Sequence, residues 1–257
     1  MNKKCRIPVI AGNWKMHNTS KQTEELINAM LPALSGFLGV KVVLCVPFTD
    51  IKTAVTATSG TGISIGAQNV HFAEKGAFTG EISTAMLLEC GAEYVIIGHS
   101  ERRQYFGETD ETVRLRTAAA LAGGMRVILC VGETLDEREG GKTEDVVKTQ
   151  LLAALDGVTS EQMESIIIAY EPVWAIGTGK NATEEQAQQV CAYIRRLVSQ
   201  KYGNATASAV IIQYGGSMKA SNASALLAMN DIDGGLIGSA SLSAEEFIKI
   251  AEAAADR

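Results

Sequence analysis

Short apolar runs recur along the whole chain and predict its strands. Eight runs rich in valine and isoleucine are mostly continuous rather than alternating, which is typical of parallel strands covered on both faces. Their starts lie roughly 20 to 45 residues apart, enough for a crossover helix between successive strands. The predicted strands are Ile7–Gly12, Val40–Pro47, Ile63–Asn69, Tyr94–Gly98, Arg126–Gly132, Ser165–Tyr170, Ala209–Tyr214 and Gly235–Gly238.

Several segments between these runs carry apolar residues at helical spacing. Two of them open with a capping-box pattern, Thr183 with Gln186 and Ser243 with Glu246. Pro32 lies near the end of a third segment, Ser20–Leu34, where a proline disfavours helix formation. The predicted helices are Ser20–Leu34, Thr109–Ala122, Lys142–Leu155, Thr183–Lys201 and Ala244–Ala254.

This organisation predicts one α/β domain over residues 1–257, because no linker or shift in composition divides the chain. Eight β–α units favour a closed eight-stranded parallel (β/α)8 barrel. A doubly wound open sheet is the alternative, and such sheets usually carry G-x-G-x-x-G after the first strand. That motif is absent from the sequence, as are the Walker A, H-E-x-x-H and G-x-S-x-G patterns.

Composition narrows the classes of function. The chain has 257 residues, 46% of them hydrophobic, and a net charge of −6, which argues against broad binding to nucleic acid or anionic membranes. No apolar stretch approaches the ~18 residues of a membrane span, and no signal peptide is predicted. Five scattered cysteines without a C-x-x-C motif indicate neither a disulfide framework nor a zinc ribbon. We therefore expect a cytoplasmic protein.

In such a barrel the carboxyl ends of the strands converge, and there the sequence gathers polar and glycine-rich segments. Glu171 follows a buried strand, where a carboxylate is costly unless it is paired or functional. Taken alone, Lys15 could be a surface lysine and His99 a hydrogen-bonded structural histidine. Glu101 and Arg102 are interpreted as a structural or orienting ion pair. The segments are Asn13–Met16, Gly98–Arg103, Tyr170–Trp174, Tyr214–Ser217 and Leu236–Ser241.

Two features predict a phosphate site under a lid. The glycine-rich segments Gly215–Ser217 and Gly238–Ser239 can direct several backbone N–H groups to one point, although each could also be an ordinary tight turn. Residues 172–180 form an apolar loop that is a liability unless it closes over a ligand. The alternative for that loop is simple packing on the surface.

Together these motifs resemble the triosephosphate isomerase family. The resemblance runs in order across nearly the whole chain, and the segment that contains the lid, Ala169–Lys180, alone contributes a twelve-residue match. It is carried by Ala11–Met16, Gly76–Glu81, Tyr94–Phe106, Ala169–Lys180, Tyr214–Ser217 and the segment around Gly238. It implies a TIM barrel and an aldose–ketose isomerase that needs no cofactor and no metal.

The resemblance implies roles for individual residues. Glu171 would move a proton between two carbons of a triose phosphate, and a neutral His99 would polarise the carbonyl. Lys15 and Asn13 would stabilise the phosphate and the enediolate, with Glu101 supporting Lys15. Substrate-binding residues would be Asn13, Lys15, Gly177, Ser217, Gly238 and Ser239. The lid would be Pro172, Val173, Trp174, Ala175, Ile176, Gly177, Thr178, Gly179 and Lys180.

Further implications concern the surroundings of the site. Ile176 and Leu236 would clamp Glu171 in a dry pocket, and Cys130 matches a family position beneath the site. The family also implies a homodimer in which Thr79 approaches the partner's Asn13 and Lys15, with Phe78 beside it. Packing within its own core is the alternative for Phe78.

One departure concerns the phosphate site, because Ser239 stands where the family usually has a second glycine. We expect modestly altered phosphate affinity, not lost activity. Two other functions stay open from the residues alone. One is a different phosphate-binding barrel enzyme, such as another sugar-phosphate isomerase or a Schiff-base aldolase, which would need a low-pKa lysine. The other is a non-enzymatic scaffold or binding protein.

Overall fold

Eight parallel strands form a closed barrel. The structure is a computed structural model that describes residues 3, 6–176 and 182–256. Each strand pairs with the next in chain order, and the first also pairs with the last, so the predicted barrel is confirmed and the open sheet is excluded. The strands are β1 Val9–Asn13, β2 Lys41–Cys45, β3 Ser64–Ala67, β4 Tyr94–Ile97, β5 Arg126–Val131, β6 Ile166–Tyr170, β7 Ile211–Tyr214 and β8 Gly234–Ile237.

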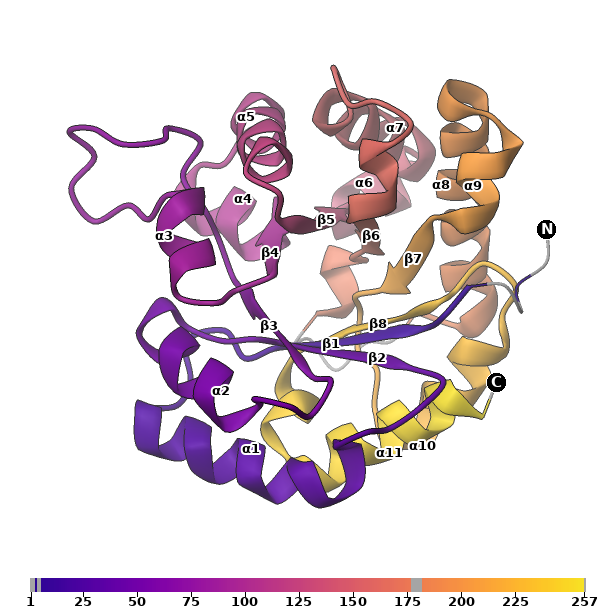
Figure 1. Ribbon diagram of the computed structural model, residues 1–257. Coiled ribbons are helices and arrows are strands. Elements are labelled where there is room, and N and C mark those ends of the chain that lie inside the picture. The colour runs from indigo at the N-terminus through magenta and orange to yellow at the C-terminus, as the bar shows by residue number, and fades with distance from the viewer. Residues whose placement is uncertain (1–2, 4–5, 177–181, 257) are drawn as a thin grey trace.

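Helices surround the strands, as Figure 1 shows. All five predicted helices are confirmed within one residue at each end: α1 Ser20–Leu34, α5 Asp110–Ala122, α7 Thr143–Ala154, α8 Glu184–Tyr202 and α11 Ala244–Ala255. Pro32 lies inside α1 without ending it. Six shorter helices were not predicted, because their few turns carry too little periodic pattern. They are α2 Ile51–Ala57, α3 Thr84–Glu89, α4 Ser100–Phe106, α6 Leu135–Glu139, α9 Asn204–Ala209 and α10 Ala220–Ala228.

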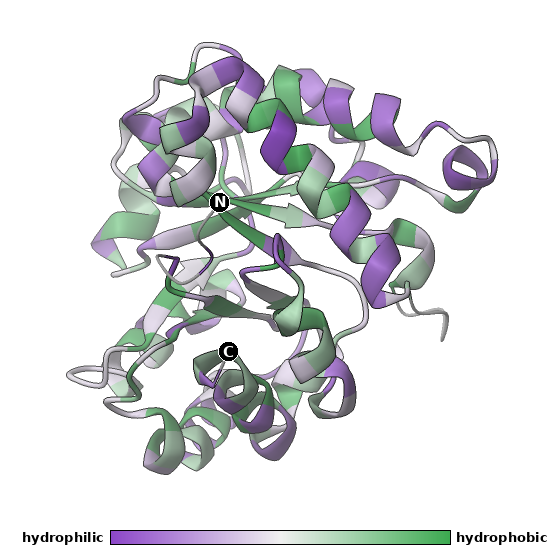
Figure 2. Ribbon diagram, turned by 90° about the vertical axis from the view of Figure 1, so that its right-hand side faces the viewer, coloured by the Kyte–Doolittle hydropathy of each residue, from purple (hydrophilic) through white to green (hydrophobic). Residues whose placement is uncertain are grey.

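The strands are buried on both faces, which explains their continuous apolar runs. One buried cluster takes alternate strand residues and fills the inside of the barrel, with small side chains such as Ala11 and Ala169 among them. The other strand residues pack outward against the helices in a larger cluster. Figure 2 shows this pattern as hydrophobic strands within helices of mixed polarity. None of the helices in the described part of the chain is long and apolar enough to span a membrane.

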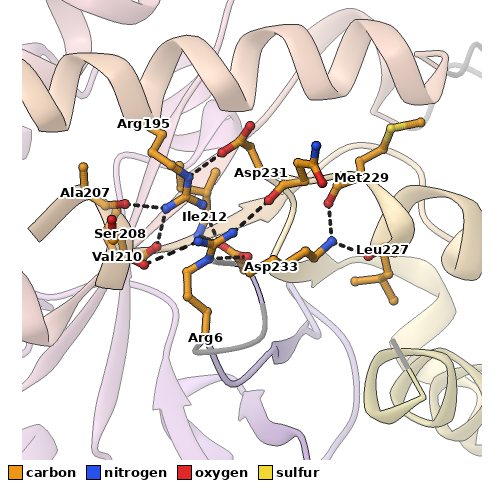
Figure 3. A network of polar contacts seen from close by, with 12 residues as sticks. Arg6, Arg195, Ala207, Ser208, Val210, Ile212, Leu227, Met229, Asp231 and Asp233 are labelled. Carbon is orange, nitrogen blue, oxygen red and sulfur yellow. Dashed lines mark hydrogen bonds and ion pairs between the residues drawn. The ribbon is translucent and has the colours of Figure 1, made fainter. Parts of the chain in front are cut away.

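A buried network of charged side chains joins the first and last strands at their amino-terminal ends (Figure 3). Arg6, just before β1, contacts Asp233, just before β8, at 2.7 Å. Arg195 of α8 contacts Asp233 and Asp231, both at 2.6 Å. Asp233 also accepts a hydrogen bond from the backbone of Ile212. Because removing one partner would leave a buried charge unpaired, the network fixes how the two strand ends meet.

Candidate active site

A cleft of about 390 Å³ opens at the carboxyl ends of the strands. It brings together side chains that are far apart in the sequence, because the ends of parallel strands meet at one rim of the barrel. The predicted site residues that line it are Asn13, Lys15, His99, Glu171, Ile176, Ser217, Leu236, Gly238 and Ser239. Predicted residues Gly177, Thr178, Gly179 and Lys180 lie outside the described residues.

A larger cavity of about 810 Å³ lies at the opposite end of the barrel. It is lined by the first residues of several strands, including Val9, Lys41, Arg126 and Ile166. It contains none of the predicted site residues. The chemistry therefore selects the smaller cleft as the candidate site.

Glu171 and His99 form the centre of the cleft. Their Oε1 and Nε2 atoms lie 2.9 Å apart, and both side chains are almost fully buried. The second carboxylate oxygen of Glu171 accepts a hydrogen bond from the backbone N–H of Ser100, at the start of α4. Burial acts to raise the pKa of Glu171, but His99 and the Ser100 amide outweigh it and hold that pKa below the usual glutamate value. Glu171 is therefore an ionised carboxylate at neutral pH.

The start of α4 determines the form of His99. The backbone N–H of Glu101 donates to His99 Nδ1 at 3.2 Å, so that nitrogen carries no proton and Nε2 is the donor toward Glu171. Burial acts to lower the pKa of His99, and the neighbouring Glu171 carboxylate raises it overall. If Glu171 moves away, burial and the Glu101 amide both favour a neutral imidazole.

Lys15 is held in a sparsely populated backbone conformation, with a φ of 51°. Its backbone N–H donates to Asn13 Oδ1 at 3.1 Å, and its carbonyl accepts from Gln68 Nε2 at 2.9 Å. Its Nζ lies 2.6 Å from the Glu101 carboxylate. These contacts fix the ammonium group over the cleft, and they give Gln68 a role that no sequence motif indicated.

Gly215 permits a close approach that a larger residue would block, because a Cβ there would lie 2.8 Å from Glu171 Cγ. A Cβ on Gly238 would lie 3.6 Å from Lys15 Cε, which is an ordinary van der Waals contact. Ser239, whose φ is not positive, opens a short 3₁₀ turn over Ser239–Leu242, so serine is accommodated there without backbone strain. The expected change in phosphate affinity stays a prediction.

The described part of the predicted lid, Pro172–Ile176, is tied to the barrel by Glu133. Glu133 Oε1 accepts hydrogen bonds from Trp174 Nε1 at 3.0 Å and Tyr170 Oη at 3.1 Å, and Arg138 contacts the same oxygen at 3.0 Å. The Trp174 ring also lies under the Arg138 guanidinium. Glu133 was not predicted, because Tyr170 and Trp174, which donate to it, lie far from it in the sequence.

Replacing Trp174 with phenylalanine should remove the indole hydrogen bond to Glu133 while keeping an aromatic ring beside Arg138. Loss of one N–H donor to a buried carboxylate is expected to lower the free energy of unfolding by about 1.5–3 kcal/mol. Urea unfolding of the variant and the parent measures the difference. An unchanged unfolding free energy would show that the indole hydrogen bond contributes nothing.

Two further predicted groups lie outside the cleft. Cys130 is fully buried beside Glu171, where burial and the carboxylate raise the pKa of its thiol well above the usual value. Such a protonated thiol is poorly suited to nucleophilic catalysis.

Thr79 and Phe78 are exposed on the long loop between β3 and α3 that extends from the barrel in Figure 1. The Phe78 ring packs against the ring of His71, with centroids 4.4 Å apart, and stays 46% exposed.

Comparison with known proteins gives one family. A sequence model described as triosephosphate isomerase matches residues 8–254. A protein of Alkaliphilus oremlandii with that name is 53% identical over 95% of this chain and 98% of its own length. Proteins of the same name from Moorella thermoacetica and Carboxydothermus hydrogenoformans are 52% and 51% identical over the same shares.

Proposed function

The chain belongs to the triosephosphate isomerase family, and on that premise we propose how its cleft interconverts D-glyceraldehyde 3-phosphate and dihydroxyacetone phosphate. The reaction belongs to glycolysis and gluconeogenesis, and its substrate is a phosphorylated triose. The observation that supports the proposal most is the pairing of an ionised Glu171 with an Nε2–H of His99 at 2.9 Å inside a buried cleft.

Glu171 is the base that moves the proton between carbons. Its carboxylate removes a proton from the carbon beside the carbonyl, and the electrons of that C–H bond form the double bond of an enediolate. The same carboxyl group then returns the proton to the neighbouring carbon. To reach the substrate the carboxylate leaves Ser100 and His99, and the absence of a side chain at Gly215 leaves room beside Glu171 Cγ.

His99 and Lys15 stabilise the oxygen atoms. The neutral imidazole donates from Nε2 to the carbonyl oxygen and transfers protons between the two oxygens, as is known for this family. The Lys15 ammonium group lies where negative charge develops on the enediolate, with Asn13 beside it and Glu101 supporting it. Because the Glu101 backbone N–H holds the imidazole and the Glu101 carboxylate holds the ammonium group before substrate arrives, little reorganisation is needed during the reaction.

The phosphate group binds at the opposite side of the cleft. Backbone N–H groups of Ser217, Gly238 and Ser239 are proposed to hold it, together with Gly177 of the lid. Closure of residues 172–180 then excludes water from the enediolate, which could otherwise lose phosphate. Ile176 and Leu236 line the cleft near Glu171 and are proposed to keep its carboxylate dry.

The direct test is turnover of D-glyceraldehyde 3-phosphate by the purified protein. Dihydroxyacetone phosphate formed is reduced by glycerol-3-phosphate dehydrogenase, and the loss of NADH absorbance gives the rate. Fast turnover in the presence of a chelator is expected. A folded protein without turnover would contradict the proposed function, and borohydride trapping of a lysine adduct would then indicate an aldolase.

The proposed form of the enzyme is a cytoplasmic homodimer of single-domain subunits. The exposed loop that carries Phe78 and Thr79 supports this proposal, because an exposed aromatic ring beside polar residues is typical of an interface. In the family this loop reaches the active site of the partner. The dimer would therefore complete each site.

Replacing Thr79 with arginine should weaken dimerisation and activity together, because a long charged side chain would have to be buried against the partner subunit. Sedimentation velocity and the isomerase assay at matched concentrations measure the two effects. Lys75→Glu, also on the exposed part of this loop, serves as a comparison for a charge change. A fully active Thr79→Arg monomer would show that activity does not depend on dimerisation.

A further inference from the structure

Most charged side chains of the cleft are already neutralised by a partner. Glu171 is paired with His99 at 2.9 Å, and Lys15 is paired with Glu101 at 2.6 Å. Lys219 also lines the cleft, and within the described part of the chain it forms no ion pair. A dianionic phosphate that enters the cleft thus meets one lysine whose charge is not already balanced by a neighbouring carboxylate.

Lys219 is placed beside the proposed phosphate-binding backbone. It comes two residues after Ser217 and immediately before α10, and its side chain is exposed. Asn222 fixes the backbone of this turn, since its Oδ1 accepts from the Lys219 N–H at 2.8 Å and its Nδ2 donates to the Ser217 carbonyl at 3.1 Å. Met218 between them is buried. Asn222 therefore holds the backbone of this turn, and neither of its hydrogen bonds involves the Lys219 ammonium group.

One acidic side chain contacts this turn, through the backbone. Glu246 of α11 accepts a hydrogen bond from the backbone N–H of Ala220 at 3.2 Å, at the first residue of α10. It does not form an ion pair with Lys219 within the described residues. Lys219 therefore lines the cleft with an exposed side chain that forms no ion pair within the described residues.

We propose that Lys219 is a specificity-determining residue that draws the phosphate dianion of the substrate to the backbone site formed by Ser217, Gly238 and Ser239. The whole chain carries a net charge of −6, which repels such a dianion at long range. A local positive charge at the cleft mouth offsets that repulsion and raises the rate of encounter. The proposal rests on the proposed function, because it names how that site selects phosphorylated trioses.

Steady-state kinetics provide the test, because triosephosphate isomerases are the standard example of enzymes whose kcat/KM is limited by diffusion. The variants are Lys219→Gln, the charge-preserving Lys219→Arg and the control Lys148→Gln. Lys148 is exposed on α7, is not among the residues that line the cleft, and its removal changes the net charge equally. Each is assayed with D-glyceraldehyde 3-phosphate and with phosphate-free D-glyceraldehyde.

Lys219→Gln should lower kcat/KM for the phosphorylated substrate about three- to fivefold at low ionic strength, near ~10 mM, with little change in kcat. The difference should vanish near ~0.5 M salt, where charges are screened within a few ångströms. Lys219→Arg, Lys148→Gln and all reactions of D-glyceraldehyde should match the parent. A purely structural role would lower the rates for both substrates at every salt concentration.

Equal kcat/KM values for Lys219→Gln and Lys148→Gln at low salt would overturn the proposal, as would an equal loss with D-glyceraldehyde. Binding of inorganic phosphate, measured by calorimetry, tests the same charge without turnover. Its Kd should weaken about threefold in Lys219→Gln and stay unchanged in Lys148→Gln. An inactive parent protein would count against the proposed function, and the phosphate titration would still decide the role of Lys219.

Discussion

Replacing Glu171 with glutamine should lower kcat by at least about 100-fold, the usual scale for the loss of an acid–base group. The amide has nearly the same shape as the carboxylate, and its oxygen can still accept from the Ser100 N–H. It cannot remove a proton from carbon. The coupled NADH assay measures the loss, and the affinity for inorganic phosphate should stay close to that of the parent.

Glu185→Gln is the matched control, because Glu185 is exposed on α8 away from the cleft. It should retain full turnover. If Glu171→Gln kept a kcat within tenfold of the parent, another group would have to be the base.

Replacing Lys15 with glutamine should lower kcat/KM by at least about 100-fold, comparable with the loss of a donor from an oxyanion hole. Asn13 and Gln68 hold the backbone of Lys15 independently of its side chain, so the variant should keep the loop in place. What is lost is the positive charge beside the developing enediolate. The expected effect is much larger than that of Lys219, because Lys15 lies over the reacting atoms.

Glu101→Gln separates the charge of Lys15 from its ion pair. This variant keeps the ammonium group and removes only its 2.6 Å partner, which is partly exposed. Its kcat/KM should fall less than about tenfold, since an exposed pair contributes little. Equal losses in Lys15→Gln and Glu101→Gln would mean that the ion pair, and not the cation, is what the reaction needs.

The sequence predicted the elements that follow from local pattern. The eight apolar runs became the eight strands, because each must be covered on both faces. The capping box of Thr183 and Gln186 correctly located the start of α8, since it satisfies N–H groups within a single turn. The short helix α4 was missed because its seven residues carry no clear apolar stripe.

The candidate site was largely predictable for a geometric reason. Once the strands are parallel and closed, their carboxyl ends must share one rim, and so Lys15, His99 and Glu171 had to face one cleft. Their side-chain types then favoured proton transfer near an anion, although a Schiff-base aldolase stayed open from the residues alone. The resemblance to a family supplied the individual roles, which composition and spacing could not.

The sequence by itself therefore determined the strands, the longer helices and the set of residues at the rim. Only the tertiary structure decided how those residues are held. Gln68 reaches the Lys15 carbonyl from the end of β3, and Glu133 joins Tyr170 to Trp174. Such contacts depend on distances between segments that are remote in the chain. The strand and helix patterns, in contrast, depend only on the burial of each residue and of its near neighbours in the sequence.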